Sequence, residues 1–389
     1  MNVLVILALA AGFVLLIAGG ESLVRGAGSL ARTMGMSSLV VGLTVVSFTT
    51  SAPELAVSTD AALSGYPGLA VGNVVGSNIA NILFVLGASA LFVPLLVNSQ
   101  VVRADIPVMV VLSVVVLLMA LDGNLGRVDG GLLFAALVVY VAVTVIVSRR
   151  RAIDGSASVR VSADGSGPGA DGPARSTTRT RSILVDLAFV ALGTVLLVAG
   201  ARLLVYGASA IATALGVSDL LIGLTVVAVG TSLPELVTCV VAVRRGERDM
   251  AVGNIVGSNV FNLGAVLGLT ALIAPEGIAV APAALRFDLP IMVAVALVLL
   301  PVTLTRLTVT RWEGALLVGF YAAYISYLVL EATEHAVLRP YSAAMLWFVI
   351  PLTALWLSAV MVHELSTRRS GGKPEVTRAV PDPTERRPG

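Results

Sequence analysis

The chain has 389 residues, of which 57% are hydrophobic and 12% charged, with a net charge of +2 and a mean hydropathy of +0.97. This composition predicts an all-α polytopic membrane protein and excludes a soluble globular domain. One cysteine and two histidines exclude a disulfide framework and make a zinc site built from Cys or His a poor explanation of the chain.

Eleven hydrophobic runs can cross a hydrocarbon core of about 30 Å at about 1.5 Å per residue. They lie at residues 2–20, 38–64, 68–97, 106–121, 130–148, 183–213, 219–244, 250–274, 287–305, 312–330 and 342–363. No basic residue precedes the first run, and it matches a later run, so we expect a retained span rather than a signal peptide. Residues 149–181 and 364–389 are rich in polar residues and Arg, which predicts a disordered cytoplasmic linker and tail.

The basic residues are distributed unequally between the two sides of the membrane. With the N-terminus outside, 21 of the 25 basic residues fall in inside loops, the linker or the tail. Three fall outside, at Arg127, Arg286 and Arg339, and Arg202 lies within a span. The positive-inside rule therefore predicts a multi-pass protein of the cell membrane with an external N-terminus and a cytoplasmic C-terminus.

The two halves of the chain repeat each other. Residues 42–87 align with residues 223–268 at an offset of 181, and 24 of the 46 positions are identical. The alignment predicts a first repeat at 1–148, a second repeat at 182–331, and an additional span at 342–363. Because each repeat holds five spans, the second is inverted in the membrane, which favours a site at the midplane between matching interrupted helices.

The first polar cluster of each repeat surrounds a glutamate within a span. It reads Thr50-Ser51-Ala52-Pro53-Glu54 in the first repeat and Thr231-Ser232-Leu233-Pro234-Glu235 in the second. A charge at this depth costs about 2.5–3.5 kcal/mol on insertion scales. No Arg or Lys is expected at that depth to neutralise the two carboxylates, which leaves protons or metal cations as their partners. Each proline removes an N–H and is expected to free a backbone carbonyl at the same depth.

The second polar cluster reads "GNVVGSNIAN" at 72–81 and "GNIVGSNVFN" at 253–262. It adds the hydroxyls of Ser77 and Ser258 and the amides of Asn81 and Asn262 to the inventory of hard oxygen donors. Such donors suit Ca²⁺ or Na⁺ and disfavour zinc and copper.

Two further features receive structural interpretations. Gly68, Gly72 and Gly76, at four-residue spacing, predict close helix packing. Asp105 and Asp288 lie beside Arg103 and Arg286 near span ends, where we expect interfacial ion pairs.

Both clusters resemble the α-repeats of the calcium/cation antiporter superfamily, in particular prokaryotic Na⁺/Ca²⁺ exchangers. The resemblance covers both repeats and implies that Glu54 and Glu235 ligate Ca²⁺. It also implies that neighbouring side chains serve Na⁺ and Ca²⁺, namely Thr50, Ser51, Ser77, Asn81, Thr231, Ser232, Ser258 and Asn262. The carbonyls of Ser47 and Ala228 would contribute to Na⁺ binding.

The chain departs from this family pattern at two positions of the motifs. Asn262 stands where many members have Asp, and Thr49 stands where Gly is usual. Two carboxylates balance one Ca²⁺, two Na⁺ or two protons, whereas three Na⁺ would leave a charge of +1. The missing acid also disfavours a subtype that cotransports K⁺.

The sequence therefore predicts a secondary antiporter that exchanges Ca²⁺ for Na⁺, with Ca²⁺/H⁺ exchange by the same two glutamates as the alternative. A cation channel fits less well because the helices are interrupted and the repeats inverted. An enzyme is not expected, because Ser51 near Glu54 lacks a His or Lys base. Ca²⁺ and Na⁺ are the expected transported ions and lipid the surroundings, with no cofactor, no nucleic-acid partner and no protein partner that the residues identify.

Overall fold

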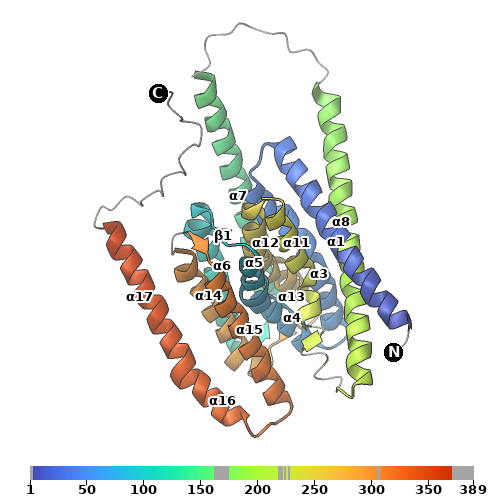
Figure 1. Cartoon of the computed structure of the whole chain (residues 1–389), viewed down its shortest axis with the longest axis vertical. Coiled ribbons are helices and arrows are strands. Elements are labelled where there is room, and N and C mark those ends of the chain that lie inside the picture. Colours follow the sequence, from blue (N-terminus) through green and yellow to red (C-terminus); the bar gives the residue numbers. More distant parts are fainter. Residues whose placement is uncertain are drawn as a thin grey trace, which may run out of the picture.

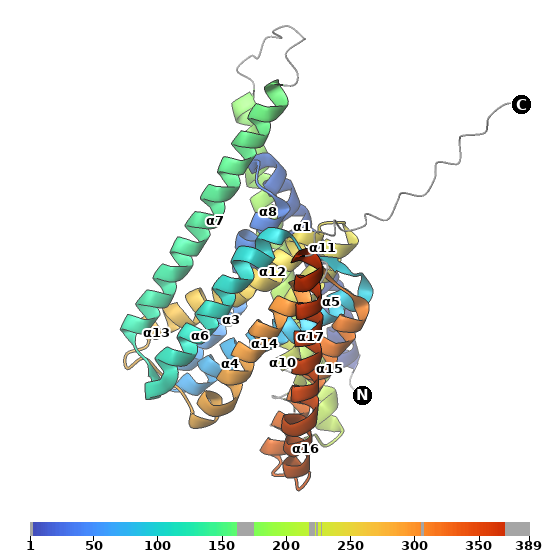
Figure 2. The same cartoon turned by 90° about the vertical axis from the view of Figure 1, so that its left-hand side faces the viewer.

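The computed structural model describes residues 3–161, 175–217, 222, 225–226, 228–304 and 307–369. The described chain is a bundle of long helices, with α1 (Val3–Met34) and α8 (Arg175–Ala214) side by side at one flank. The continuous helix formed by α16 (Leu338–Ala344) and α17 (Ile350–Arg369) lies at the other flank (Figure 1). Figure 2 shows α7 standing on the outside of the bundle, and α7 and α8 both project beyond its upper end. The helical architecture predicted from composition is confirmed.

The first repeat runs from α1 to α7, with η marking π-helical or 3₁₀ turns. Its elements are α1 (Val3–Met34), α2 (Ser38–Val41), η1 (Gly42–Val46), α3 (Ser47–Leu63), α4 (Pro67–Ala80), η2 (Asn81–Leu86), α5 (Gly87–Phe92), β1 (Leu95–Leu96), η3 (Val101–Asp105), α6 (Ile106–Met119), η4 (Ala120–Asp122), β2 (Asn124–Leu125) and α7 (Arg127–Val161).

The second repeat runs from α8 to α15, and one further long helix follows it. Its elements are α8 (Arg175–Ala214), α10 (Ala228–Thr231), α11 (Leu233–Arg244), α12 (Arg248–Phe261), η6 (Asn262–Leu267), α13 (Gly268–Ile273), β3 (Ile278–Ala279), η7 (Ala284–Asp288), α14 (Leu289–Leu304), β4 (Thr308–Val309) and α15 (Arg311–Ala332). This last helix is continuous and consists of α16 (Leu338–Ala344), η8 (Met345–Val349) and α17 (Ile350–Arg369).

Ten helical stretches of the described chain are long and apolar enough to span a membrane. They match ten of the eleven predicted spans, and the predicted span 219–244 lies partly outside the described residues. Its described part comprises α10 and α11, which together are too short to count as a span. The described residues therefore contain ten candidate spans of a multi-pass membrane protein.

The segment predicted to be a disordered linker is helical at both ends. Helix α7 continues to Val161 and α8 begins at Arg175, whereas disorder was expected from 149 to 181. Once a membrane helix is nucleated, each further residue adds a hydrogen bond at little cost, so the helix propagates into a polar sequence. Helix α17 likewise extends to Arg369, beyond the predicted end of its span. Residues 162–174 and 370–389 lie outside the described residues.

Local sequence signals account for several helix starts. Helix α4 starts at Pro67, where the missing N–H has no helical partner to lose. Helix α15 starts with a capping box, in which the Thr310 backbone N–H donates to the Glu313 carboxylate at 2.7 Å. These two signals fix where α4 and α15 begin.

Two short antiparallel strand pairs connect loops of opposite repeats. Strand β1 pairs with β4, with Leu95 opposite Val309, and β2 pairs with β3, with Leu125 opposite Ile278. The predicted topology places β1 and β4 on the cytoplasmic side and β2 and β3 on the outer side. Each pair therefore joins two loops that the topology expects on the same side of the membrane.

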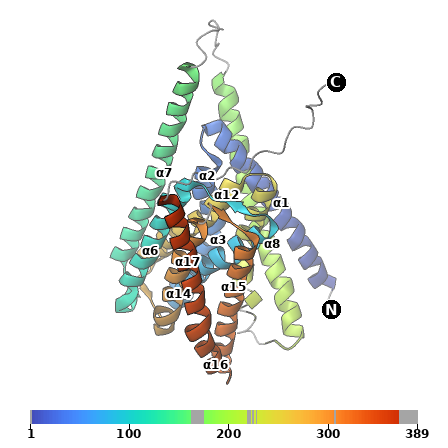
Figure 3. The same ribbon diagram turned by 60° about the vertical axis from the view of Figure 1, so that its left-hand side comes forward.

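Glycines hold α1 and α8 in close antiparallel contact, and Figure 3 shows the two helices running together at the edge of the bundle. A Cβ built on Gly12 would lie 2.9 Å from the carbonyl oxygen of Gly200, and one on Gly19 would lie 2.7 Å from the backbone nitrogen of Leu197. The glycines recur every seven residues at equivalent positions of the two helices: Gly12, Gly19, Gly26, Gly193, Gly200 and Gly207. This seam makes α1 and α8 one packed pair.

The packing role predicted for the glycines of α4 is wrong. A Cβ built on Gly68, Gly72 or Gly76 meets no described atom within 4 Å, and Gly72 is exposed. The equivalent of Gly72 in α12 is packed tightly, since a Cβ on Gly253 would lie 2.7 Å from the carbonyl oxygen of Leu39. Gly72 and Gly76 correspond to Gly253 and Gly257, whereas Gly68 corresponds to Asp249, so for the two shared positions the difference in packing arises from the surroundings.

Candidate cation-binding site

The ten side chains predicted to bind cations lie on helices that meet between the two repeats. The first repeat supplies five of them from α3, α4 and the start of η2: Thr50, Ser51, Glu54, Ser77 and Asn81. The second repeat supplies the equivalent five from α10 to the start of η6: Thr231, Ser232, Glu235, Ser258 and Asn262. All are buried except Thr231, which is half-buried. The two predicted backbone ligands begin helices, Ser47 at α3 and Ala228 at α10.

The two proline motifs interrupt their helices to different degrees. Helix α3 continues through Pro53 from Ser47 to Leu63. In the second repeat the chain breaks at Ser232, between α10 and α11, and Pro234 occupies the first turn of α11. Glu235 therefore lies in the first turn of a helix, where unpaired backbone N–H groups favour negative charge.

Contacts across the repeat interface join the first polar cluster of the first repeat to the second polar cluster of the second repeat. The Thr50 hydroxyl on α3 lies 3.2 Å from the Ser258 hydroxyl and 3.3 Å from Oδ1 of Asn254, both on α12. Glu54 and Glu235 are 3% and 1% exposed, and their carboxylates interact electrostatically. Two like charges buried this close together are strongly unfavourable without a cation or proton between them.

Four asparagines form a crossed arrangement that orients the amide ligands. The Asn81 side-chain NH₂ donates to Oδ1 of Asn259 at 3.3 Å, and the Asn262 NH₂ donates to Oδ1 of Asn78 at 3.1 Å. Because each NH₂ group is engaged by the opposite repeat, the oxygen of each predicted ligand is held on the other side of its amide. Asn81 and Asn262 also begin the π-helical turns η2 and η6, and such turns often occur at functional sites.

Seven buried side-chain oxygens of the predicted ligands have no hydrogen-bond partner among the described residues. They are Ser51 Oγ, Glu54 Oε2, Asn81 Oδ1, Ser232 Oγ, Glu235 Oε1, Glu235 Oε2 and Asn262 Oδ1. Buried polar atoms are normally satisfied, so a cluster of orphaned oxygens is the arrangement expected of a cation cage. The described residues contain no group of three His, Cys, Asp or Glu side chains able to hold a metal. Such a cage therefore depends on two carboxylates and neutral oxygens.

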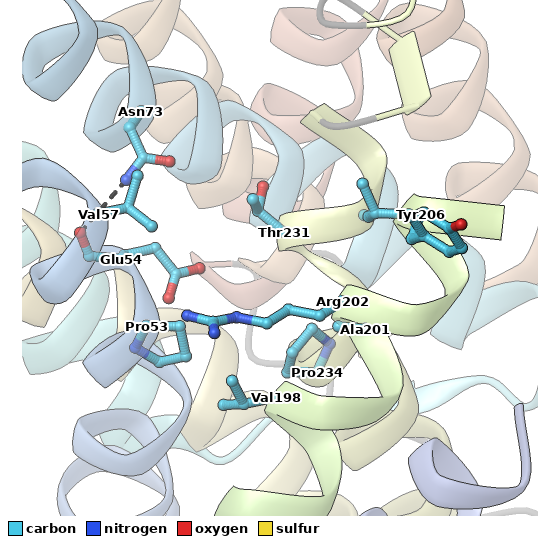
Figure 4. A pocket seen from close by; sticks show the side chains of 12 residues that line it. Pro53, Glu54, Val57, Asn73, Val198, Ala201, Arg202, Tyr206, Thr231 and Pro234 are labelled. Carbon is cyan, nitrogen blue, oxygen red and sulfur yellow. Dashed lines mark hydrogen bonds between the residues drawn. The ribbon is translucent and has the colours of Figure 1, made fainter. Parts of the chain in front are cut away.

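A cavity of about 330 Å³ adjoins Glu54 and corrects one expectation about charge. It is lined from α3 and α4 by Glu54 and Asn73, and from α8 by Arg202. Figure 4 shows the Arg202 guanidinium directed toward the Glu54 carboxylate, while Asn73 donates to the Glu54 backbone carbonyl at 3.3 Å. The expectation that no Arg lies at the depth of the carboxylates is therefore wrong, because the face of α8 that carries Arg202 is directed toward the site.

The sequence contained signals for the residues that the predicted site omitted. Asn73 and its equivalent Asn254 are identical in the two "GN" motifs, and so are Asn78 and Asn259 in the two "GSN" motifs. Repetition of an amide within a span, where no water can satisfy it, already indicates a specific partner. Arg202 was identified as the basic residue within a span, but its depth relative to Glu54 could not be deduced without the packing of α8.

The two repeated aspartates near span ends bind tyrosines rather than the expected arginines. The Tyr140 hydroxyl donates to Asp105 at 3.0 Å, and the Tyr324 hydroxyl donates to Asp288 at 2.9 Å. Asp105 is 2% exposed, too deeply buried for the interfacial ion pair that its neighbour Arg103 suggested. The pairs are related by the repeat and fasten η3 to α7 and η7 to α15.

The chain matches the family model described as sodium/calcium exchanger protein over residues 4–146 and 185–330. These two segments cover both repeats and all ten side chains of the candidate site. The chain belongs to the sodium/calcium exchanger family. It is therefore a multi-pass cation antiporter of the exchanger type, and its family is one of transporters rather than catalytic enzymes.

Curated relatives and solved structures match most of the chain. The sodium/calcium exchanger MaX1 of Methanosarcina acetivorans is 33% identical over 343 residues, 82% of this chain and 97% of MaX1. The inner membrane protein YrbG of Escherichia coli is 38% identical over 301 residues, 75% of this chain and 86% of YrbG. A structure of the sodium-calcium exchanger NCX_Mj soaked with Na⁺ and Ca²⁺ is 29% identical, with a TM-score of 0.68 over 84% of this chain and 99% of NCX_Mj.

Proposed function

We propose that this exchanger moves Ca²⁺ out of the cell in exchange for Na⁺, with Glu54 and Glu235 as the Ca²⁺ ligands. The observation that carries the proposal is the cluster of orphaned oxygens contributed by both repeats at the depth of the two carboxylates. Ca²⁺ takes six to eight oxygen ligands, which this set of carboxylates, hydroxyls and amides can provide. The names of MaX1 and NCX_Mj, both sodium/calcium exchangers, support the choice of ions.

Competition for one set of oxygens would couple the two ions. One Ca²⁺ neutralises the two carboxylates, and so do two Na⁺ ions, whereas both together would leave excess positive charge at low dielectric. With Asn at 81 and 262, no third carboxylate is available in the candidate site to balance another Na⁺. Ca²⁺ and Na⁺ therefore bind alternately, and each crossing of the loaded site carries one kind of ion.

The packed pair α1–α8 is suited to expose this site to each side in turn. Both helices contact each other through backbone at the glycine seam, so we expect them to move together as one body. α3, α4, α11 and α12, which carry the ligands, would stay in place while this pair slides past them. The positive-inside bias supports the cell membrane as the location, with the linker and the C-terminus in the cytoplasm.

Flux measurements in proteoliposomes test the exchange. Vesicles loaded with Na⁺ should take up external Ca²⁺ rapidly, and uptake should fall to background when internal Na⁺ is replaced by choline. An imposed pH gradient without Na⁺ serves as the second arm. Uptake that follows the pH gradient and ignores Na⁺ would replace this proposal with Ca²⁺/H⁺ exchange by the same two glutamates, and flux far above carrier rates would indicate a channel.

A further inference from the structure

Arg202 is a charge in a place where membrane helices seldom carry one. It lies within the candidate span Ile183–Ala214, twelve residues before the span ends at Ala214. An arginine inside a span is costly unless it faces a cavity or an acidic partner. Among the described residues that line the cavity beside it, Arg202 carries the one positive charge and Glu54 the one negative charge.

The placement of Arg202 on α8 directs its side chain into this cavity. Val198, Ala201, Arg202 and Val205 follow one another at helical spacing and all line the same cavity. The guanidinium extends from this face toward the carboxylate of Glu54 (Figure 4). Within the described residues the two side chains are not within ion-pair distance, so the guanidinium has to move closer to the carboxylate before it can replace a cation there.

The other repeat carries the opposite charge at the equivalent position. The repeat offset of 181 relates Arg202 to Glu21 of α1. Glu21 forms an ion pair with Arg245, which follows α11, and that pair is exposed rather than buried at the site. The two repeats therefore differ at this position. On α1, Glu21 forms a peripheral ion pair, whereas on α8 the positive charge of Arg202 lies beside the candidate ligands.

We propose that Arg202 is a tethered competitor that takes the place of a transported cation at Glu54 when the site is empty. The arriving cation displaces the guanidinium, which retreats into the cavity because the two positive charges repel each other. This role lowers the affinity for the transported ion, which speeds ion release. It also links the occupancy of Glu54 on α3 to the position of α8, because Arg202 moves with the α1–α8 pair. The inference rests on the proposed function, since it assumes that Glu54 binds the transported cation.

Calcium binding to purified variants tests the competitor. Isothermal titration with Ca²⁺ should show binding about tenfold tighter in Arg202→Gln than in the wild type, because a repelling charge has been removed. Arg202→Lys keeps the charge and should bind within about twofold of the wild type. Arg339→Gln, which removes an exposed arginine at the start of α16, should also match the wild type.

A charge-rescue measurement separates competition from a packing role. In Arg202→Cys, reaction of the introduced cysteine with a reagent that adds an aminoethyl ammonium should restore wild-type affinity, whereas a neutral methyl label should leave binding tight. The native Cys239 is buried, and the treated wild type provides the control for it. This rescue reports on charge even if Arg202→Gln folds poorly.

The outcomes for the two proposals can be distinguished. Ca²⁺ binding by the wild type with unchanged or weaker binding in Arg202→Gln, or equal effects of the charged and neutral labels, would overturn the role of Arg202 alone. A wild-type protein that neither binds nor transports Ca²⁺ would overturn the exchange function and this inference with it.

Discussion

Helices α4 and α12 carry the same motif in the two repeats but lie in different surroundings. Every residue of α12 from Met250 to Phe261 is buried, whereas α4 exposes Gly68 and Gly72. The cavity beside Glu54 is lined partly by α4, through Asn73. The two repeats supply nearly identical ligands. They differ in how completely the neighbouring helices cover α4 and α12. In an inverted repeat, a conformation in which α4 is covered and α12 is exposed would open the site to the opposite side of the membrane.

Removing either carboxylate is the strongest test of whether the two repeats contribute equally to ion binding. We expect Glu54→Gln and Glu235→Gln each to lower Na⁺-driven Ca²⁺ uptake at least about 100-fold, because loss of one charge from a buried charge cluster costs several kcal/mol. The measurement is initial uptake in proteoliposomes at matched protein content. Glu276→Gln, which changes an exposed loop residue, is the control and should retain full uptake. Full activity in either site variant would show that its carboxylate is not a ligand.

The crossed asparagines test whether the two repeats contribute equal amide ligands, and the expected effect is smaller. Asn78→Ala and Asn259→Ala should each weaken Ca²⁺ binding about tenfold, because the amide of Asn262 or Asn81 loses the partner that orients its oxygen. Titration calorimetry measures the affinity, and Asn98→Ala in an exposed loop serves as the control. A large effect in one variant and none in the other would mean that only one amide is a ligand.

The repeat and its two glutamates could be predicted because identical polar residues inside spans have few explanations other than a shared site. The same alignment predicted two inverted repeats whose ligand clusters face each other. The orientation of Arg202 could not be predicted, because it depends on which face α8 turns toward α3. That choice is made by the glycine seam between α1 and α8, whose register follows from packing rather than from hydrophobicity.

Spacing alone also gave the wrong explanation for two sets of residues. Gly68, Gly72 and Gly76 have the spacing of a packing face, yet the glycines in close contact are Gly253 and Gly257 of α12, the equivalents of Gly72 and Gly76. Asp105 was expected to pair with Arg103, its neighbour in sequence, but it accepts a hydrogen bond from Tyr140 on α7. In both cases the deciding partner lies on another helix, and a single helix contains no information about it.

Adding a methyl group to the glycines of α4 and α12 tests the difference in covering directly. Gly253→Ala should lower the free energy of unfolding by about 1–3 kcal/mol, because its Cβ would collide with the carbonyl oxygen of Leu39. Gly72→Ala should be neutral or stabilise the protein by up to about 1 kcal/mol, because Ala favours helix and the position is open. Thermal unfolding of the purified variants in detergent compares the two, and equal destabilisation would contradict the difference.

The same pair of variants also examines whether the two surroundings are exchanged during transport. If α4 becomes covered when the site opens to the other side, the methyl group of Gly72→Ala would obstruct that second state while leaving the described one intact. Gly72→Ala should then slow Ca²⁺ uptake about threefold or more, for a cost near 1 kcal/mol in one state, without a fall in its thermal midpoint. Unchanged uptake in this variant would mean that α4 stays open throughout the cycle, and that the inequality between α4 and α12 is a fixed property of the fold.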